Sequence, residues 1–264
     1  MKDEYYFVGI DAGTSYTKAV LINIKMELLS FFVRRTGISI EASSSAAFKA
    51  ILSSASLSKI DINHITATGY GKSKVDFANT YKTEISCHAK GAYHYFPKEI
   101  TIIDIGGQDT KVIKLDNKGK IIRFKMNRKC AAGTGAFIEE IAHQLDIPLT
   151  ELNNLAAKSA SNAPLASYCT VFAKTEILSR IKQGEKVEDL LKSVFGSVIK
   201  RIIEMAELEG TIVLTGGVIA HNKIIGEILK NEIKLNILIP PNPQFIGALG
   251  AALFSRQYFN LNLE

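Results

Sequence analysis

Short apolar runs separated by glycine-containing turns dominate the first part of the chain. Residues 5–11 form an apolar run that ends in Asp-Ala-Gly-Thr-Ser, and residues 18–22 resume it, which predicts two strands joined by a tight turn. A third strand is expected at residues 28–35. Helices are then expected at 41–54 and 84–96, and a strand ending in a Gly-flanked loop at 63–71. The pattern indicates a mixed α/β unit.

The same strand-turn-strand pattern returns later in the chain. Residues 10–20 read IDAGTSYTKAV and residues 103–113 read IDIGGQDTKVI. The matching pairs include Asp11 and Asp104, Gly13 and Gly106, Thr17 and Thr110, and Lys18 and Lys111. A third strand is expected at residues 119–126, as at 28–35 in the first copy. Two copies of one unit predict two like-folded halves.

The remaining pattern supplies the other elements of the second half. Helices are expected at 149–159, at 173–182, at 187–209, from about residue 221, and at 245–254. An extended piece is expected at 167–172, and strands are expected at 212–214 and 235–239. This organisation predicts an N-terminal half at residues 1–96, with residues 245–264 packing back on it, and a C-terminal half at residues 97–244.

Composition and charge narrow the class of protein. The 264 residues have 47% hydrophobic content, enough to bury substantial cores. The net charge is +6, but the basic residues are scattered, which predicts no nucleic-acid partner. The excess charge is consistent with solubility or with attraction to an acidic protein partner. Three cysteines are too few for a disulfide framework, no apolar run has membrane-spanning length, and the N-terminus lacks a signal-peptide pattern. We therefore expect a cytoplasmic protein with no membrane partner.

The repeated glycine turns predict a phosphate site. Glycine removes the side chain that would keep backbone N–H groups away from phosphate oxygens. Asp11 and Asp104 begin the two turns, and carboxylate oxygens suit a Mg²⁺ ion that bridges a polyphosphate. A single such turn could be an ordinary hairpin. Because the turn is repeated, phosphate binding is the favoured interpretation.

Two further pairs of glycines leave alternatives open. Gly216 and Gly217 end a strand and open a helix, where they offer a flat backbone surface for a nucleotide base or ribose, or form a simple strand-to-helix turn. Gly247 and Gly250 lie in the last helix. They allow either a hinge between the halves or ordinary close packing of the helix against a sheet.

The stretch at residues 127–145, NRKCAAGTGAFIEEIAHQL, places Cys130 directly ahead of a small-residue turn that opens a helix. Unpaired N–H groups and the positive end of a helix dipole favour an anion such as a thiolate, which makes Cys130 a candidate ligand. The alternative is a small buried side chain beside a glycine-containing helix cap. The stretch alone leaves both open.

These motifs resemble the actin, heat-shock chaperone and sugar-kinase superfamily of ATPases. GIDAGTSYTK resembles its first phosphate motif, IDIGGQDTK its second, LTGGVIAHN its adenosine motif, and FIGALGAAL its inter-domain connection. Within it, NRKCAAGTGAF, SYCTVFAKTEI, TGYG and EISCHAKGA resemble the ATP-dependent activators of 2-hydroxyacyl-CoA dehydratases and the related ATPase subunits of benzoyl-CoA reductases. The resemblance implies two ribonuclease-H-like halves of the actin and sugar-kinase type with an ATP cleft between them.

The resemblance also implies roles for single residues. ATP or ADP would be held by Asp11, Gly13, Thr14, Ser15, Lys18, Gly106, Gly107, Gly133, Gly216, Gly217, Val218, Asn222 and Gly247. Asp11 and Asp104 would hold Mg²⁺. Gln108 would orient the hydrolytic water, because its amide can both accept from water and donate to phosphate, with Asp104 as the alternative catalytic group. Lys72 and Lys174 depart from the family pattern, which bears on partner fit more than on ATP binding.

For the cysteines, the resemblance implies one [4Fe–4S] cluster at the interface of a homodimer, and transfer of a low-potential electron to a dehydratase or a related reductase component. Such a cluster needs four cysteine ligands. Two-fold symmetry doubles Cys130 and Cys169 to four, and two Cys130-headed helices would aim their positive ends at the cluster. Cys87, inside an expected helix, fits a buried structural thiol. The electron donor would be a ferredoxin or flavodoxin.

Two other functions remain open. A small-molecule kinase of the same fold, such as a sugar-type kinase, would explain the phosphate and adenosine turns but not the cysteine motifs. A nucleotide-dependent interaction module without turnover would bind ATP and not hydrolyse it.

Overall fold

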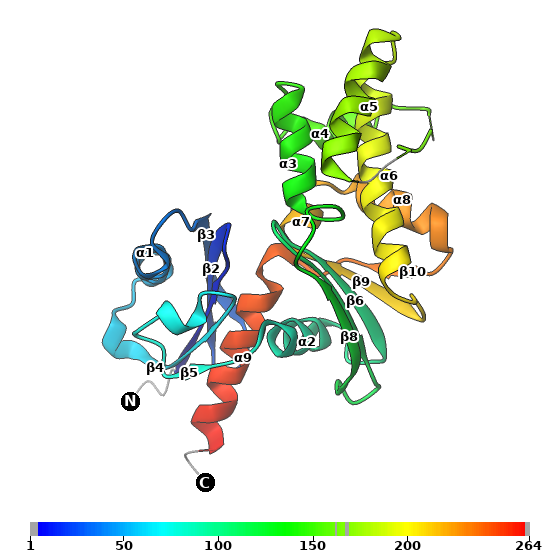
Figure 1. Cartoon of the computed structure of the whole chain (residues 1–264). Coiled ribbons are helices and arrows are strands. Elements are labelled where there is room, and N and C mark those ends of the chain that lie inside the picture. Colours follow the sequence, from blue (N-terminus) through cyan, green and yellow to red (C-terminus); the bar gives the residue numbers. More distant parts are fainter. Residues whose placement is uncertain (1–4, 162, 167–168, 262–264) are drawn as a thin grey trace. The chain divides into compact units, whose positions relative to one another are not determined.

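The computed structural model describes residues 5–161, 163–166 and 169–261 (Figure 1). Contacts divide the chain into two compact units. The first comprises the chain up to Lys98, Leu115–Ile122 and the chain from Phe245 on. The second comprises Glu99–Lys114 and Arg123–Gln244.

A five-stranded sheet forms the centre of the first unit. Its order is β3-β2-β1-β4-β5. Strand β2 pairs antiparallel with both β1 and β3, whereas β4 pairs parallel with both β1 and β5. The strands are β1 (Tyr6–Ala12), β2 (Tyr16–Asn23), β3 (Leu28–Arg35), β4 (Ile62–Thr68) and β5 (Thr80–Tyr81). Its helices are α1 (Ile40–Ser54), α2 (Glu84–Tyr95) and α9 (Ile246–Leu261), with short 3-10 turns at Lys59–Asp61 and Lys72–Lys74.

The alternation of side chains along β1 assigns the two faces of this sheet. Val8 and Ile10 pack in one core with α1 residues such as Phe48. Gly9 points the other way, where a Cβ atom would lie 2.0 Å from the Ala248 carbonyl oxygen of α9. Helix α9 therefore lies against the backbone of β1, and only glycine permits that approach. Asp11 follows Gly9 on the same face, since strand side chains alternate.

The second sheet repeats the first. Its order is β8-β7-β6-β9-β10, which matches β3-β2-β1-β4-β5 strand for strand. The strands are β6 (Ile100–Ile105), β7 (Thr110–Leu115), β8 (Ile121–Asn127), β9 (Thr211–Thr215) and β10 (Asn236–Leu238). The predicted fold class, α/β with two like-folded halves, is confirmed.

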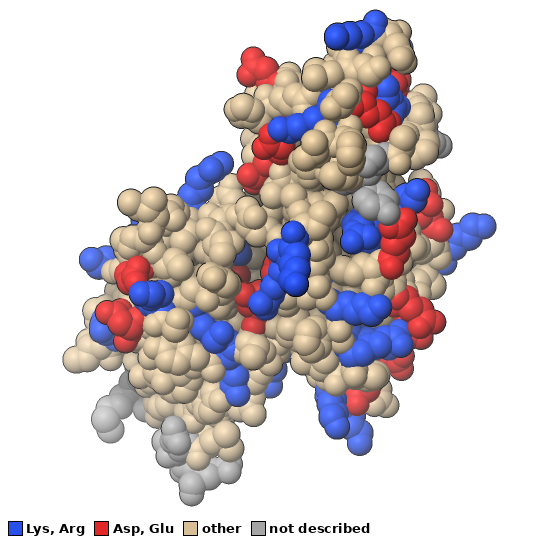
Figure 2. Space-filling model, in the orientation of Figure 1, with Lys and Arg blue, Asp and Glu red and all other residues tan. Residues whose placement is uncertain are grey.

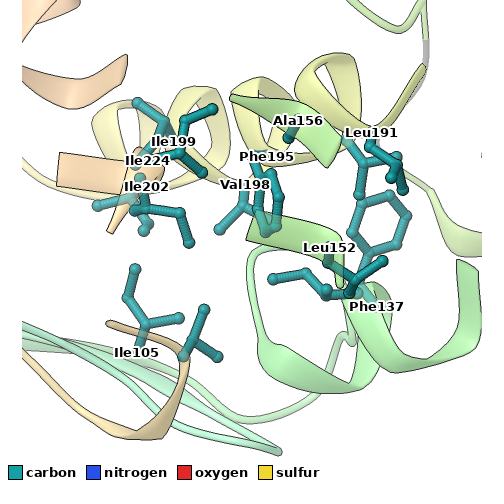
Figure 3. Packing of buried hydrophobic residues seen from close by; sticks show 14 of the residues in the cluster. Ile105, Phe137, Leu152, Ala156, Leu191, Phe195, Val198, Ile199, Ile202 and Ile224 are labelled. Carbon is teal, nitrogen blue, oxygen red and sulfur yellow. The ribbon is translucent and has the colours of Figure 1, made fainter. Parts of the chain in front are cut away.

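Helix α6 is the main packing element of the second unit. Its apolar positions recur every three or four residues, as in Leu191, Phe195 and Val198, and form one buried stripe. Figure 3 shows this stripe with Phe137 and Ile105 in one cluster. The helices are α3 (Gly135–Gln144), α4 (Leu152–Ala156), α5 (Thr170–Lys182), α6 (Val187–Met205), α7 (Gly217–His221) and α8 (Ile224–Ile233), with a 3-10 turn at Pro243–Phe245.

Several elements differ from the sequence prediction. The extended piece expected at 167–172 is wrong from Thr170 on, because α5 starts there; Ser167 and Tyr168 lie outside the described residues. Aromatic and β-branched residues favour strands, but here a helix packed on the core overrides that preference. The short β5 was not predicted, the helix expected from about residue 221 is two helices, α7 from Gly217 and α8 from Ile224, and α6 ends at Met205. Among the described residues, no helix has both the length and the apolar character needed to cross a membrane.

Candidate nucleotide and cysteine sites

The first glycine turn joins β1 to β2 and holds a buried aspartate. The Gly13 N–H donates to the Tyr16 carbonyl at 3.2 Å, and a Cβ atom at Gly13 would lie 2.7 Å from that oxygen, so the turn needs glycine. The Lys18 Nζ atom lies 2.9 Å from Asp11 Oδ2. The turn thus presents a carboxylate that a lysine already neutralises.

The second turn, between β6 and β7, has the same construction. The Gly106 N–H donates to the Asp109 carbonyl at 2.9 Å, and Lys111 Nζ lies 3.4 Å from Asp104 Oδ2 and 2.7 Å from Asp109 Oδ1. Asp104 Oδ1 accepts from the Thr215 hydroxyl at 2.9 Å. The sequence repeat therefore corresponds to a repeated structure, in which each aspartate pairs with the lysine seven residues later.

The tips of the two turns offer backbone donors. Among the described residues, no hydrogen bond is made by the N–H groups of Thr14 and Ser15 in the first turn, or of Gly107 and Gln108 in the second. The Gln108 side chain is exposed. Consecutive N–H groups without acceptors form the concave surface that binds phosphate oxygens.

The turn after β9 has a structural need for glycine. Gly216 has φ +101°, and a Cβ atom there would lie 2.3 Å from the Ile105 carbonyl oxygen. A Cβ atom at Gly217 would lie 3.2 Å from the Gln244 side chain. Asn222 is buried and its Nδ2 donates to the Val218 carbonyl at 3.0 Å, whereas its buried Oδ1 has no partner within the described residues. Tight packing thus explains Gly216, and the amide oxygen of Asn222 is available to a ligand.

In the first unit, α9 packs closely on α2 through glycines. A Cβ atom at Gly250 would lie 1.8 Å from the Cys87 carbonyl oxygen. A Cβ atom at Gly247 would lie 3.0 Å from His88 Nε2 and 3.4 Å from Asp11 Oδ2. Close packing is therefore seen at both positions. Sequence reasoning missed His88 as a neighbour of Asp11, and its only signal was its place beside Cys87 in EISCHAKGA.

Cys87 is fully buried in α2. Burial raises the pKa of its thiol to about 12, while a hydrogen bond with the Thr68 hydroxyl acts in the opposite direction. The thiol is therefore neutral near pH 7 and is a poor nucleophile or metal ligand. The expectation of a buried thiol at Cys87 agrees with this environment.

Cys130 is exposed and, as expected, lies directly ahead of a small-residue turn that leads into a helix. Helix α3 begins at Gly135, five residues later. The expectation of unpaired N–H groups at this helix start is wrong for two of them, since Gly135 donates to the Gly106 carbonyl at 2.9 Å and Ala136 to the Gly107 carbonyl at 2.7 Å. The small residues that suggested free donors instead allow the loop to pack on the second glycine turn.

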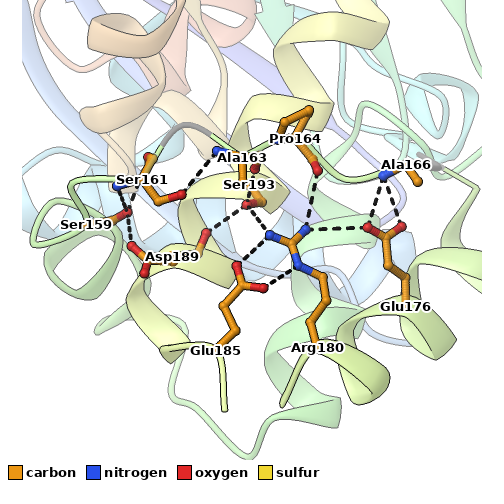
Figure 4. A network of polar contacts seen from close by, with 10 residues as sticks. All are labelled: Ser159, Ser161, Ala163, Pro164, Ala166, Glu176, Arg180, Glu185, Asp189 and Ser193. Carbon is orange, nitrogen blue, oxygen red and sulfur yellow. Dashed lines mark hydrogen bonds and ion pairs between the residues drawn. The ribbon is translucent and has the colours of Figure 1, made fainter. Parts of the chain in front are cut away.

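Cys169 is the cysteine at a helix start. It is exposed and is the N-cap residue of α5, at the positive end of the helix dipole. A polar network holds the segment before it (Figure 4): the Glu176 carboxylate accepts from the Ala166 N–H at 3.0 Å, and Arg180 donates to the Pro164 carbonyl and to Glu185. Sequence reasoning placed Cys169 in an extended piece and missed its position at a helix start.

Helices α3 and α5 are joined by Lys174, which is ion-paired with Glu140. The hydrogen bond from Lys174 lowers the pKa of the Glu140 carboxyl. A positive charge at position 174 therefore has a partner within the unit.

A comparison with protein families matches residues 8–255 to the BadF/BadG/BcrA/BcrD ATPase family. The chain belongs to this family. Its relatives include the activator of lactoyl-CoA dehydratase from Anaerotignum propionicum, to which it is 42% identical over 95% of this chain and 97% of the relative. As a member of the BadF/BadG/BcrA/BcrD ATPases, the protein is an ATPase.

Two solved structures of family members resemble this one over nearly their whole length. Component A of (R)-2-hydroxyglutaryl-CoA dehydratase from Acidaminococcus fermentans has a TM-score of 0.92 at 34% identity, covering 97% of this chain and 99% of that one. The activator of 2-hydroxyisocaproyl-CoA dehydratase from Clostridium difficile, with bound ADPNP, has a TM-score of 0.91 at 34% identity, covering 98% and 97%. A ROK family glucokinase from Streptomyces griseus, at 14% identity and a TM-score of 0.60 over 96% of this chain and 99% of that one, shares the fold only.

Proposed function

We propose that the protein is an ATP-driven electron donor that activates a 2-hydroxyacyl-CoA dehydratase or a related CoA-ester reductase. The observation that carries this proposal is the pair of exposed cysteines, Cys130 and Cys169, in the same unit as the second phosphate turn. A kinase of this fold would leave these two cysteine motifs unexplained. The relatives named as dehydratase activators support the same function.

For the nucleotide, we propose that the tip N–H groups of both glycine turns bind the phosphate oxygens of ATP. Asp104 has both carboxylate oxygens engaged, by Lys111 and Thr215, so it would reach Mg²⁺ through metal-bound water, which Mg²⁺ usually retains. Asp11 would act alike in the first turn. Exposed Gln108 would orient the hydrolytic water. The adenosine would be bound at Gly216, Gly217, Val218 and Asn222, supported by the buried Oδ1 of Asn222, which has no partner among the described residues. Gly133 and Gly247 are the other residues proposed to bind the nucleotide.

For the cluster, we propose that Cys130 and Cys169 of two copies ligate one [4Fe–4S] centre. Among the described residues of one chain, no group of three or more metal-ligating side chains is present, whereas two copies supply four exposed thiols. The exposed side chains of Val171, Phe172 and Leu178 on α5 offer apolar surface for the second copy. When bound, such a cluster supplies one electron at low potential.

For the donor, we propose an acidic ferredoxin or flavodoxin. On the face drawn in Figure 2, basic side chains gather over β8 and the loop that follows it. Lys125, Arg128 and Lys129 are exposed and, within the described residues, none has a carboxylate partner. This positive surface leads directly to Cys130 in the sequence, and complementary charge speeds the encounter of two proteins.

Anaerobic purification with iron-sulfur reconstitution tests the cluster and the dimer. We expect a brown protein that sediments as a dimer with about four irons per dimer, and that activates a dehydratase or a benzoyl-CoA-type reductase only with ATP and a reduced donor. A colourless protein after full reconstitution would rule the proposal out. Phosphoryl transfer to a panel of sugars, unchanged in Cys130→Ala, would instead establish a kinase, and ATP binding without hydrolysis would establish an interaction module.

A further inference from the structure

The loop that carries Cys130 is bonded to the second phosphate turn at one end and to strand β8 at the other. At the α3 end, the N–H groups of Gly135 and Ala136 donate to the carbonyls of Gly106 and Gly107, at 2.9 and 2.7 Å. All of these residues lie in the second unit, so the bonds are internal to one compact body. The loop therefore forms a continuous hydrogen-bonded path from the turn to the cysteine.

Two peptide groups of the turn, Gly106–Gly107 and Gly107–Gln108, contact the start of α3 through their carbonyls and point their N–H groups towards the proposed phosphate site. The carbonyl of Gly106 and the N–H of Gly107 belong to one planar peptide group, and so do the carbonyl of Gly107 and the N–H of Gln108. In a trans peptide the carbonyl and the N–H point in opposite directions. Each group thus has its carbonyl on α3 and its N–H without an acceptor among the described residues. An anion that reorients these N–H groups must therefore also move the Gly106 and Gly107 carbonyls, which accept hydrogen bonds from the first residues of α3.

Thr110 extends the path from the turn into the loop. It is the first residue of β7, its side chain is buried, and its hydroxyl donates to the Gly133 carbonyl at 2.5 Å. Gly133 has φ +81°, a conformation that other residues adopt at a cost. Thr134 closes the loop on itself by donating from its hydroxyl to the Ala131 carbonyl at 2.6 Å. A shift of the turn is therefore carried into residues 131–134.

Asn127 holds the backbone of Cys130 itself. It ends β8, and its Nδ2 atom donates to the carbonyls of Cys130 at 3.0 Å and of Ala132 at 2.8 Å. One amide thus sets the position of the cysteine relative to the sheet. Because a side-chain amide has two donor hydrogens, both bonds can form together.

The first half of the chain provides an internal comparison. Thr17 is the counterpart of Thr110, but its hydroxyl bonds to Thr36, which in turn donates to the Gly13 carbonyl of its own turn. The first half has no cysteine at that place. The first half also links its turn to the residue after β3, since the Thr36 N–H donates to the Ser15 carbonyl at 2.9 Å. What distinguishes the second half is that its linked loop carries Cys130.

We propose that Thr110 and Asn127 are positioning residues that couple phosphate binding at Gly107 and Gln108 to the position of Cys130. The inference rests on the proposed binding of ATP at this turn. It requires neither the cluster nor the dimer, since every contact in the path lies within one chain.

The test measures alkylation of Cys130 by N-ethylmaleimide in cluster-free protein, with and without ADPNP and Mg²⁺. Mass spectrometry of the cysteine peptides reports Cys130 and Cys169 separately. We expect ADPNP to change the alkylation rate of Cys130 by about five-fold, the effect expected of one or two hydrogen bonds. Asn127→Asp and Thr110→Val should lose this change while they bind ADPNP with wild-type affinity, and Thr110→Ser should retain it.

Matched variants separate coupling from general loosening of the fold. Thr101 is also a buried threonine of the second unit whose hydroxyl donates to a carbonyl, that of Glu209 at 2.9 Å. Thr101→Val should leave the nucleotide effect intact. If ADPNP binds and the Asn127→Asp and Thr110→Val proteins respond like wild type, or wild type does not respond, the coupling inference is wrong. If ADPNP does not bind at all, the proposed function fails and the inference falls with it.

Discussion

At the scale of single residues, both glycine turns place an aspartate against a lysine and leave the tip exposed. The pairs Asp11–Lys18 and Asp104–Lys111 are buried or nearly so, whereas Gln108 is exposed at the tip of the second turn. Buried ion pairs in a turn keep the backbone donors in place. We propose that the exposed Gln108 side chain is the one that acts on the hydrolytic water.

Replacing Gln108 should slow ATP hydrolysis without weakening ATP binding. Loss of one transition-state hydrogen bond costs about 100-fold in rate, so we expect Gln108→Ala to lower the kcat for ATP hydrolysis by that order with a nearly unchanged Kd for ADPNP. Steady-state phosphate release and equilibrium dialysis measure the two quantities. Gln183→Ala, at the exposed end of α5, is the matched control. Equal losses in binding and in kcat would contradict the assigned role.

Cys87 predicts a particular dependence of stability on pH. Burial raises its folded-state pKa to about 12 from the ordinary value of 9.0. The unfolded thiol ionises first, so the stability that this group contributes is complete below about pH 9 and is lost as pH rises towards 12, at about 1.4 kcal/mol per pH unit. Urea unfolding at pH 8 and pH 10 under reducing conditions should show a smaller loss in Cys87→Ala than in wild type. An equal loss in both proteins would contradict the buried-thiol assignment.

At the scale of elements, close helix packing explains the glycines of α9. Gly9 in β1 and Gly250 in α9 leave no room for a Cβ atom, because the nearest backbone atoms would lie 2.0 and 1.8 Å away. Three layers of the first unit, namely β1, α9 and α2, thus contact one another through backbone atoms. Close contact of α9 with its neighbours therefore explains the glycines of FIGALGAAL in this chain.

A methyl group at Gly250 should destabilise the first unit. The Cβ atom would overlap the Cys87 carbonyl, and overpacking of this kind costs about 1–3 kcal/mol. We expect Gly250→Ala to lower the free energy of unfolding by that amount in chemical denaturation. Gly196→Ala, in α6, is the matched helical control, since its Cβ atom would meet nothing within 4 Å. It should be neutral or stabilise by up to about 1 kcal/mol. A neutral Gly250→Ala would show that α9 can move away from α2.

At the scale of the whole molecule, the positive charge that the sequence spreads along the chain has a local concentration after β8. Lys125, Arg128 and Lys129 are exposed there, while Arg123 is ion-paired with Glu207 and Glu209. Unpaired charge acts on a partner, whereas paired charge is largely cancelled. The surface before Cys130 is thus suited to an acidic protein.

Reversing two of these charges should slow reduction by an acidic donor. We expect Lys125→Glu with Lys129→Glu to lower the rate of reduction of the reconstituted protein by reduced ferredoxin about ten-fold at low salt, and to weaken the salt dependence of that rate. Stopped-flow absorbance measures both. Lys230→Glu, at an exposed position of α8, should have little effect. Reduction by dithionite should be the same in all three proteins, and a wild-type rate with ferredoxin would exclude this surface.

The two hairpins and their glycine turns could be predicted from the sequence, because they depend on interactions between near neighbours in the chain. The pairs Asp11–Lys18 and Asp104–Lys111 lie within single hairpins, so a repeat in sequence produces a repeat in structure. Backbone hydrogen bonds and side-chain alternation act over the same short range.

Only the tertiary structure decided how the cysteines are placed. The start of α3 is bonded to Gly106 and Gly107, which lie about thirty positions earlier in the sequence, and this leaves Cys130 in a loop while Cys169 begins a helix. The approach of His88 to Asp11 and the two-residue strand β5 also depend on partners distant in sequence. Local preference cannot predict such contacts, because the free energy that selects them comes from packing between elements.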